Sequence, residues 1–244
     1  MSTTTPHTQI AYKDTPIGKI PADWEVKRLG DFLEFKNGIN SSKENYGNGM
    51  PFINVMEVIS KNYITYEDIP GAIEISEEQA EIYLVTKGDV LFNRTSETQE
   101  EVGLAAVYES DEKVVFGGFV IRGKEKESLI DNLFKRYCYR SSILRRQIIR
   151  NGQGAVRANI GQGELSKINI PLPPLSEQKR IAEVLSTWDQ AIQLTEQLIR
   201  QKEQRKKWLM QNLLTGKMRL KGFSGEWKKI GAGEVFKSVA KKGY

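Results

Sequence analysis

Every charged side chain in residues 132–163 is cationic, because this stretch contains no aspartate or glutamate. Lysine and arginine displace counterions from a nucleic-acid backbone, so such a stretch is typical of a surface that faces phosphates. The alternative is an ordinary solvated helix face, and the complete absence of acids favours the phosphate-facing interpretation. The cations of this stretch are Lys135, Arg136, Arg140, Arg145, Arg146, Arg150 and Arg157.

The end of this stretch, residues 151–163, is rich in glycine and carries polar side chains that can bridge base edges. Arginine, asparagine and glutamine form bidentate hydrogen bonds with bases, and glycine lets a loop approach DNA closely. We expect Gln153, Arg157 and Asn159 to lie in this loop as candidate DNA contacts. A plain connecting loop is the alternative, and a structural role is a further alternative for Asn159.

Two further polar segments are candidates for the same surface. Residues 35–49 form a loop rich in Gly, Asn and Ser with Lys36 and Lys43. This loop either reaches a groove of the nucleic acid or is a flexible surface loop. The second segment lies at the end of a predicted strand, where hydroxyl groups could bind phosphate. A turn capped by Ser or Thr explains these hydroxyls equally well, but it does not explain the arginine. Its candidates are Arg94, Thr95 and Ser96.

The residue counts argue against several kinds of catalytic site. The chain has 244 residues, a formal net charge of +5, one cysteine (Cys138) and one histidine (His7). These counts exclude an internal disulfide and do not fit a Cys/His zinc site or a nucleophile activated by histidine. We find no signal peptide and no apolar run of about 20 residues, and we therefore expect a cytoplasmic protein.

The elements that must position these side chains are those of a mixed α/β domain over residues 15–170, after a flexible N-terminus at residues 1–14. An apolar stripe at helical spacing predicts one helix over residues 132–152, which Asn151-Gly152 ends. β-branched and aromatic residues bounded by glycine and charged turns predict strands. These strands lie at residues 49–59, 88–95, 102–110 and 113–123.

A Pro-rich hinge, residues 171–175, connects this domain to a long helix over residues 176–216. Ser176 is a favourable N-cap and Gly216 a natural stop, which gives a helix of roughly 60 Å. Apolar residues recur along it at heptad-like spacing, with polar interruptions, and predict a dimerisation surface. The stripe consists of Ile181, Leu185, Trp188, Ile192, Ile199, Leu209 and Leu213.

The last part of the chain, residues 217–244, repeats the beginning of the domain. Asp23-Trp24 is followed by Gly30-Asp31, and Glu226-Trp227 is followed by Gly233-Glu234. Basic residues follow each tryptophan, and an aromatic residue follows each glycine within a few positions. We interpret residues 217–244 as the start of a second, incomplete copy of the domain.

Four segments carry a family resemblance. They are WEVKRLGD (residues 24–31), GDVLFNRTSETQEEVGLAAVY (88–108), GAVRANIGQGELSKINIPLP (154–173) and IPLPPLSEQKRIAEVL (170–185). They resemble, in turn, the domain opening, two parts of the target-recognition domain, and the hinge-to-helix signature of specificity subunits of type I restriction–modification systems. The usual member of that family has two recognition domains and two long helices, so this chain is similar to a half-length form.

The resemblance implies an α/β (α+β) target-recognition domain and a long helix that pairs with a partner helix in an antiparallel, coiled-coil-like bundle. It implies a non-catalytic subunit that reads one half of a split double-stranded DNA target and positions a methyltransferase subunit and a restriction subunit. A homodimer reading a palindromic split site would restore the missing half. We find no S-adenosylmethionine motif and no Walker A loop, so S-adenosylmethionine, ATP and magnesium are expected only with the partner subunits.

Two other functions stay open from the residues alone. A stand-alone metal-dependent nuclease needs clustered carboxylates near a lysine. The acidic pairs Glu77-Glu78 and Glu100-Glu101 have no distinctive spacing to one. A helical scaffold that binds only protein explains the long helix but leaves the acid-free basic stretch without a use.

Overall fold

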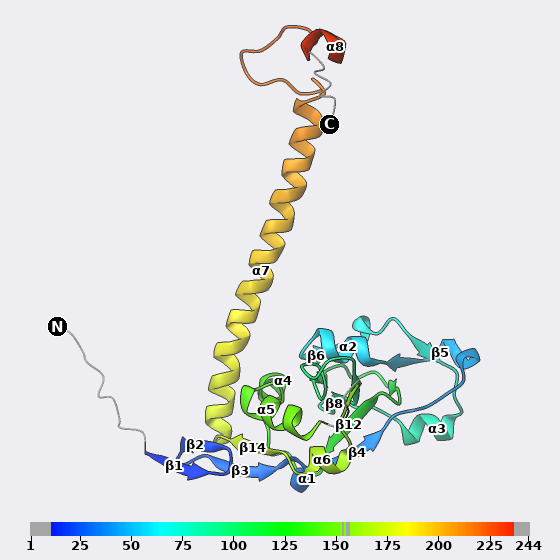
Figure 1. Cartoon of the computed structure of the whole chain (residues 1–244), viewed down its shortest axis with the longest axis vertical. Coiled ribbons are helices and arrows are strands. Elements are labelled where there is room, and N and C mark those ends of the chain that lie inside the picture. Colours follow the sequence, from blue (N-terminus) through cyan, green and yellow to red (C-terminus); the bar gives the residue numbers. More distant parts are fainter. Residues whose placement is uncertain (1–10, 153, 155–156, 237–244) are drawn as a thin grey trace, which may run out of the picture. The chain divides into compact units, whose positions relative to one another are not determined.

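The computed structural model describes residues 11–152, 154 and 157–236, apart from the side chain of Lys43. The chain divides into two compact units, residues 1–185 and residues 186–244. Helix α7 (Leu175–Leu213) begins in the first unit and continues in the second (Figure 1). Within the described residues, no helix is both long enough and apolar enough to cross a membrane.

A five-stranded sheet forms the centre of the first unit. Its strands run antiparallel except for β10 and β6, which are parallel. Both faces of the sheet are buried, because Phe92 and Val107 lie in one hydrophobic cluster while Leu91 and Tyr108 lie in another. The strand order is β4 (Leu33–Asn37), β12 (Val120–Glu125), β8 (Val90–Asn93), β10 (Ala105–Tyr108), β6 (Tyr63–Ile64).

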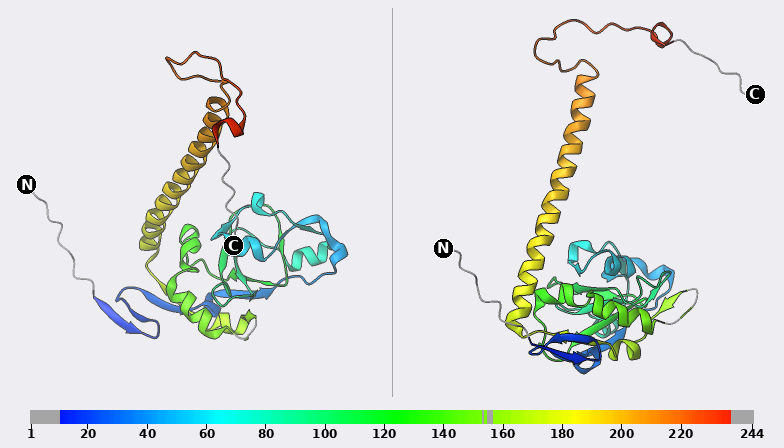
Figure 2. Two further views of the ribbon diagram at one scale, coloured as in Figure 1. Left: turned by 45° about the horizontal axis from the view of Figure 1, so that its top comes forward. Right: turned by 60° about the vertical axis from the view of Figure 1, so that its left-hand side comes forward.

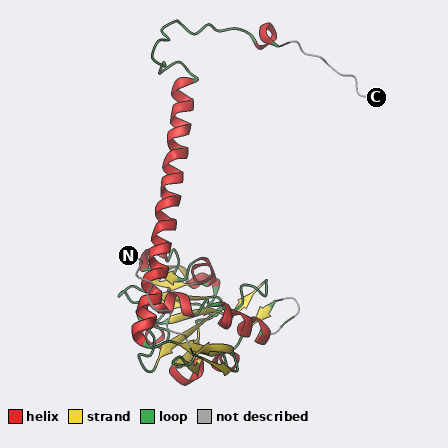
Figure 3. Cartoon of the chain, turned by 90° about the vertical axis from the view of Figure 1, so that its left-hand side faces the viewer, coloured by secondary structure: helices red, strands yellow, loops and turns green. Residues whose placement is uncertain are grey.

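Short helices surround the strands of this unit (Figure 3). Phe134, Leu144 and Ile148 pack into the cluster that contains Phe92, whereas Val58 packs into the opposite cluster. The helices are α1 (Leu29–Phe32), α2 (Val55–Ser60), α3 (Glu77–Ile82), α4 (Asn132–Cys138), α5 (Ser142–Asn151) and α6 (Gln162–Ser166), with single 3-10 turns at Lys43–Asn45 and Tyr66–Asp68.

Smaller sheets complete the unit. One is a hairpin of β1 (Tyr12–Thr15) and β2 (Gly18–Pro21). Another has the order β11 (Val115–Phe116), β5 (Tyr46–Ile53), β7 (Ala72–Ile73). Two pairs join segments that are distant in sequence: β9 (Thr95–Ser96) with β13 (Ala158–Asn159), and β3 (Glu25–Arg28) with β14 (Asn169–Leu172).

The strands predicted at residues 88–95 and 102–110 are confirmed by β8 and β10, but the strand predicted at residues 49–59 is wrong in its second half. β5 ends at Ile53 and α2 begins two residues later. Asn54 caps the helix, since its side chain accepts from the Val55 N–H (2.8 Å) and its own N–H donates to the Glu57 carboxylate (2.8 Å). This capping box redirects the chain although the residues have strand-like composition.

Two other predicted elements are interrupted. The strand at residues 113–123 becomes β11 and β12, because Gly117 and Gly118 form a turn in which the Val120 N–H donates to the Gly117 carbonyl (2.9 Å). The helix at residues 132–152 becomes α4 and α5. At its break the buried ring of Tyr139 packs edge-on against Phe92, with ring centroids 5.8 Å apart.

The predicted hinge is divided between a strand and the helix. Pro171 and Leu172 belong to β14 and pair with β3, and α7 already begins at Leu175. The predicted N-cap at Ser176 is therefore wrong. The carbonyl of Pro174 accepts from the N–H groups of Glu177 (2.9 Å) and Gln178 (3.0 Å), so the helix starts earlier.

Gln178 anchors this first turn of α7 to the domain. Its side chain is buried, donates to the carbonyls of Leu129 (3.2 Å) and Pro173 (2.9 Å), and accepts from the Asp131 N–H (2.8 Å). Trp24 supports the same turn, because its indole Nε1 donates to the Glu177 carboxylate (2.9 Å).

The described part of the second unit, residues 186–236, consists of the remainder of α7, a segment without regular structure and the short helix α8 (Ala232–Val235). The predicted stop at Gly216 is confirmed. Gly216 has φ +73° and donates its N–H to the Leu213 carbonyl (3.2 Å), a left-handed geometry that favours glycine after a helix.

Candidate nucleic-acid interface

Polar loops from separate parts of the sequence meet at one end of the five-stranded sheet. At this end β4 finishes at Asn37, β8 finishes at Asn93 and β12 starts at Val120; Ile121 pairs with Asn37, and Val120 pairs with Asn93. Adjacent antiparallel strands begin and end at the same edge, so the connections that follow these strands must lie together. The predicted segments 35–49 and 92–98 are therefore neighbours in the fold.

The loop at residues 157–161 joins this end through β13. Asn159 pairs with Thr95, and the Ile160 N–H donates to the Arg94 carbonyl (3.0 Å). The side chains meet as well, because Thr95 Oγ1 donates to Asn159 Oδ1 (2.7 Å). In the right-hand view of Figure 2, β13 (yellow-green) lies at the rim of the domain.

Arg94 connects this strand pair to the turn between β11 and β12. Its N–H donates to the Phe119 carbonyl (2.8 Å), and its guanidinium Nη1 donates to the Gly118 carbonyl (3.3 Å). Arg94 and Thr95 are half-buried, whereas Asn159 and Arg157 are exposed. The Asn159 amide also donates to the Arg157 carbonyl (3.1 Å), which holds the two residues in one local arrangement.

Ser96 has a different role from its neighbours. Its side chain is buried, donates to the Glu101 carboxylate (2.9 Å) and accepts from the Thr98 N–H (3.2 Å). These bonds shape the loop that follows β9, which matches the capped-turn alternative for this hydroxyl.

The basic stretch divides into cations that the protein engages and cations that face solvent. Arg140 donates to the carbonyls of Ala105 and Val58 (both 2.6 Å), and Arg145 donates to those of Val102 and Glu100 (both 2.7 Å). Burial lowers the pKa of the Arg140 guanidinium to about 10, with a smaller contribution from the nearby Arg145 charge, and burial also lowers the pKa of Arg145. Both guanidiniums therefore join segments within the domain and do not belong to the candidate interface.

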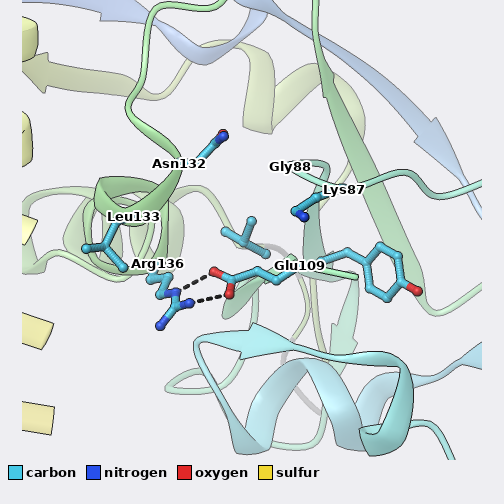
Figure 4. A pocket seen from close by; sticks show the side chains of 8 residues that line it. Lys87, Gly88, Glu109, Asn132, Leu133 and Arg136 are labelled. Atoms are coloured by element: carbon cyan, nitrogen blue, oxygen red, sulfur yellow. Dashed lines mark hydrogen bonds and ion pairs between the residues drawn. The ribbon is translucent and has the colours of Figure 1, made fainter. Parts of the chain in front are cut away.

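The two α4 cations are engaged by acids from other segments. Lys135 is buried and forms an ion pair with the Glu125 carboxylate (2.8 Å), whose pKa is raised by burial. Arg136 binds the Glu109 carboxylate through two nitrogens and stacks over Tyr63, 4.1 Å from the ring centroid. Figure 4 shows this ion pair in the wall of a hollow of about 220 Å³.

The cations that remain exposed are Arg146, Arg150 and Arg157. α5 carries the first two and ends beside the loop that follows β9, because Gly103 packs against Ile148. Arg146 and Arg150 line a hollow of about 130 Å³ with Pro16 and Ile17, which connect β1 to β2.

The other predicted contacts are placed as follows. Lys36 is half-buried on β4, with its ammonium 5.5 Å from the centroid of the Tyr83 ring. The side chain of Lys43 and all of Gln153 lie outside the described residues. Sequence reasoning missed Asn40 and Phe119, which are exposed at the same end of the sheet. The Gly117-Gly118 pair inside an apolar run was the available signal for the turn that presents Phe119.

Arginine, asparagine and threonine side chains grouped on short loops can donate to and accept from base edges in the major groove. Guanidiniums beside them can bind phosphates. Among the residues that the structure describes, no group of three or more His, Cys, Asp or Glu side chains has the arrangement of a metal site.

A second candidate surface runs along α7. Trp188, Ile192 and Ile199 are 67%, 54% and 52% exposed. Ile181 packs partly against the first-unit core, Leu185 is 38% exposed, and Leu209 and Leu213 are half-buried. Ile181 and Leu185 line an apolar hollow of about 300 Å³ with Trp24 and Phe134, and Leu209 and Leu213 line another of about 360 Å³.

Comparisons with known proteins agree with these features. The family model "Type I restriction modification DNA specificity domain" matches residues 21–204. A putative type I restriction enzyme MjaX specificity subunit from Methanocaldococcus jannaschii is 31% identical over 207 residues, covering 84% of this chain and 48% of that protein. The EcoKI specificity subunit from Escherichia coli is 29% identical over 177 residues, covering 70% of this chain and 37% of that protein. The chain thus spans about half the length of the curated relatives it matches, or less.

Solved structures share the fold. A chain from a study of assembly and conformational transition of the type I R-M system has a TM-score of 0.59 at 21% identity, covering 80% of this chain and 46% of that one. The HsdS subunit from Thermoanaerobacter tengcongensis has a TM-score of 0.54 at 19% identity, covering 77% of this chain and 42% of that one. With its mixed α/β domain, its long helix and the family match over three quarters of its length, this chain belongs to the type I restriction–modification DNA specificity subunit family.

Proposed function

We propose that the chain is a non-catalytic DNA-recognition subunit that reads one half of a bipartite target. The observation that carries this proposal is the meeting of Arg94, Thr95 and Asn159, from distant segments, at one end of the five-stranded sheet. These residue types read base edges, and the turns around them hold them in one arrangement. Arg146, Arg150 and Arg157 would bind the flanking phosphates.

The proposal includes a homodimer formed through α7. Exposed Trp and Ile side chains in one stripe are a liability in water unless a partner covers them. The opposite side of the helix is mainly polar and carries exposed glutamines, with Leu194 and Trp208 as exposed apolar exceptions, so the stripe is the more continuous apolar surface. These glutamines are Gln190, Gln193, Gln197, Gln201 and Gln204.

The charges along α7 favour an antiparallel pair of copies. Residues 181–199 contain three acids and no base, and residues 200–208 contain five bases and one acid. An antiparallel arrangement brings the acidic part of each copy beside the basic part of the other, whereas a parallel arrangement opposes like charges. The two-fold axis implies a palindromic split site whose spacing is determined by α7.

Catalysis would reside in other polypeptides. In this proposal a methyltransferase subunit and a restriction subunit bind this chain in the cytoplasm and supply S-adenosylmethionine, ATP and magnesium chemistry. The chain's contribution is to place those subunits at one DNA sequence.

The DNA-reading part is tested by selection from a randomised duplex library with the full chain, followed by affinity measurements at several salt concentrations. We expect an enriched motif, and a salt slope that falls by about one when Arg157→Ala removes a phosphate contact. Lys113→Ala is the matched control, because Lys113 is also an exposed cation but lies beyond the opposite end of β10. Failure of the wild-type chain to enrich any motif would contradict the proposal.

The dimer is tested by sedimentation at micromolar concentration. We expect Ile199→Glu to convert a dimer into a monomer, because it places a charge in the buried stripe of both copies. Gln197→Glu introduces the same charge on the opposite side of the helix and should leave the dimer intact. A wild-type monomer, or equal effects of the two substitutions, would refute the homodimer.

A further inference from the structure

Phe119 stands out at the end of the sheet where the polar loops meet. Among the described residues from 83 to 174, it is the only large apolar side chain that is exposed, at 58%. Its neighbours along the chain, Val115, Phe116 and Val120, are fully buried. The turn therefore presents this one ring to solvent while burying the rest of the segment.

Hydrogen bonds hold this turn in place on several sides. The Gly117 N–H donates to the Ile53 carbonyl (2.9 Å), and the Gly118 N–H donates to the Ile39 carbonyl (2.8 Å). The Phe119 carbonyl accepts from the Arg94 N–H (2.8 Å). Bonds to three different segments leave the backbone little freedom to fold the ring back onto the domain.

Close packing of the two glycines adds to this rigidity. A Cβ at Gly117 would lie 2.7 Å from the Phe52 ring, and one at Gly118 would lie 1.9 Å from Asn40 Oδ1. Gly117 leaves room for the buried Phe52 ring, whereas the exposed Asn40 side chain could move away from a Cβ at Gly118. Isolated exposed apolar residues are common on protein surfaces, but this one lies on a turn whose backbone is held by hydrogen bonds to three other segments.

The residues around Phe119 indicate which chemical group its ring contacts. The bonds of Arg94 to the Phe119 and Gly118 carbonyls place the candidate base-reading cluster directly beside the turn. In the major groove the one apolar group on a base edge is the C5-methyl of thymine, and phenylalanine is among the side chains that contact it. An aromatic ring in a fixed position can contact this methyl group while the neighbouring polar side chains hydrogen-bond with the polar base edges.

We infer that Phe119 is a specificity-determining residue that packs against a thymine methyl in the half-site. This inference rests on the proposed DNA-recognition function and adds to it an apolar contact. Burying one methyl group changes an equilibrium about four-fold, so the expected effect is modest and confined to one base position.

The test compares thymine with deoxyuridine, which lacks only the methyl group. A duplex carrying the motif selected by the wild-type chain is made with each thymine replaced in turn, and affinities are measured by fluorescence anisotropy. We expect one position at which deoxyuridine weakens wild-type binding about four-fold. Phe119→Ala should bind both duplexes equally, and Phe119→Leu should keep part of the discrimination.

Ile82→Ala is the control, because Ile82 is also an exposed apolar residue, at 47%, but lies on α3 outside the turn. Two results would overturn the inference: Phe119→Ala still distinguishes thymine from deoxyuridine, or the wild-type chain distinguishes them at no position. In either case an enriched motif would still support the proposed function. Loss of binding to a protein partner in Phe119→Ala, with unchanged DNA discrimination, would assign the ring to that partner instead. Absence of any enriched motif would overturn both.

Discussion

Residues 24–33 and residues 227–236 share a capped four-residue helix in different surroundings. The four-residue helices α1 and α8 occupy equivalent places after Trp24 and Trp227. In the first copy the Arg28 N–H donates to the Asp31 carboxylate (3.0 Å), and in the second the Gly231 N–H donates to the Glu234 carboxylate (3.2 Å). An acidic residue three positions after the cap closes this turn in both places.

The surroundings of the two copies differ. In the first, Leu29, Phe32 and Leu33 are almost completely buried. In the second, Val235 is 56% exposed and Phe236 is 74% exposed. The first copy lies against β14, α6 and the start of α7, which come from residues more than a hundred positions away. A capping motif therefore specifies a turn, whereas burial requires partners that the motif does not contain.

The largest difference is expected for the apolar residue at the end of each helix. Phe32→Ala should lower the free energy of unfolding by about 3–5 kcal/mol, since it leaves a cavity in the main hydrophobic cluster. Val235→Ala, the equivalent substitution in the second copy, should change it by less than about 0.5 kcal/mol. Urea denaturation followed by circular dichroism measures both, and similar losses would mean that the second copy is also packed.

A smaller difference is expected for the glycine inside each helix. A Cβ at Gly30 would lie 2.7 Å from Ser166 Cβ, whereas a Cβ at Gly233 would meet nothing within 4 Å. Gly30→Ala should therefore cost about 1–3 kcal/mol of unfolding free energy through overpacking.

Gly233→Ala is the matched control for Gly30→Ala, because both glycines hold the same position in their helices and gain the same helix propensity. It should be neutral or slightly stabilising. Equal results from urea denaturation of the two variants would show that the close approach of α1 to α6 does not constrain Gly30.

The smallest difference is expected for the tryptophans. Trp24→Phe removes the hydrogen bond to Glu177 and should cost about 1 kcal/mol of unfolding free energy. Trp227 is 58% exposed and stacks near Arg219, 5.7 Å from the ring centroid, so Trp227→Phe should have little effect. A double-mutant cycle of Trp24→Phe with Glu177→Gln measures the coupling, and additive effects of the two substitutions would show that this bond does not anchor α7.

Predictions from the sequence succeeded where the determining interactions are local. The strands at residues 88–95 and 102–110, the long helix and its stop at Gly216 all follow from composition, periodicity and glycine. The errors at residues 49–59 and 132–152 arose where a cap or a buried side chain redirected a segment whose composition also suited a continuous element. Asn54 with Glu57, and Tyr139 at the break between α4 and α5, were decisive there.

The candidate site was only partly predictable for the same reason. Arg94, Thr95, Arg157 and Asn159 could be chosen by residue type, but their meeting depends on the pairing of β9 with β13. The acid-free basic stretch gave no indication that Arg140 and Arg145 would bond to carbonyls of other segments.

The sequence by itself determined the family, the α/β composition, the bounds of α7 to within a few residues and the repeated Trp–Gly–acid motif, since each depends on residues close together in the chain. The tertiary structure decided which cations face solvent, which loops share one end of the sheet and which copy of the motif is buried. These properties depend on hydrogen bonds and packing between residues far apart in sequence, such as Thr95 with Asn159, and no local pattern encodes such pairs.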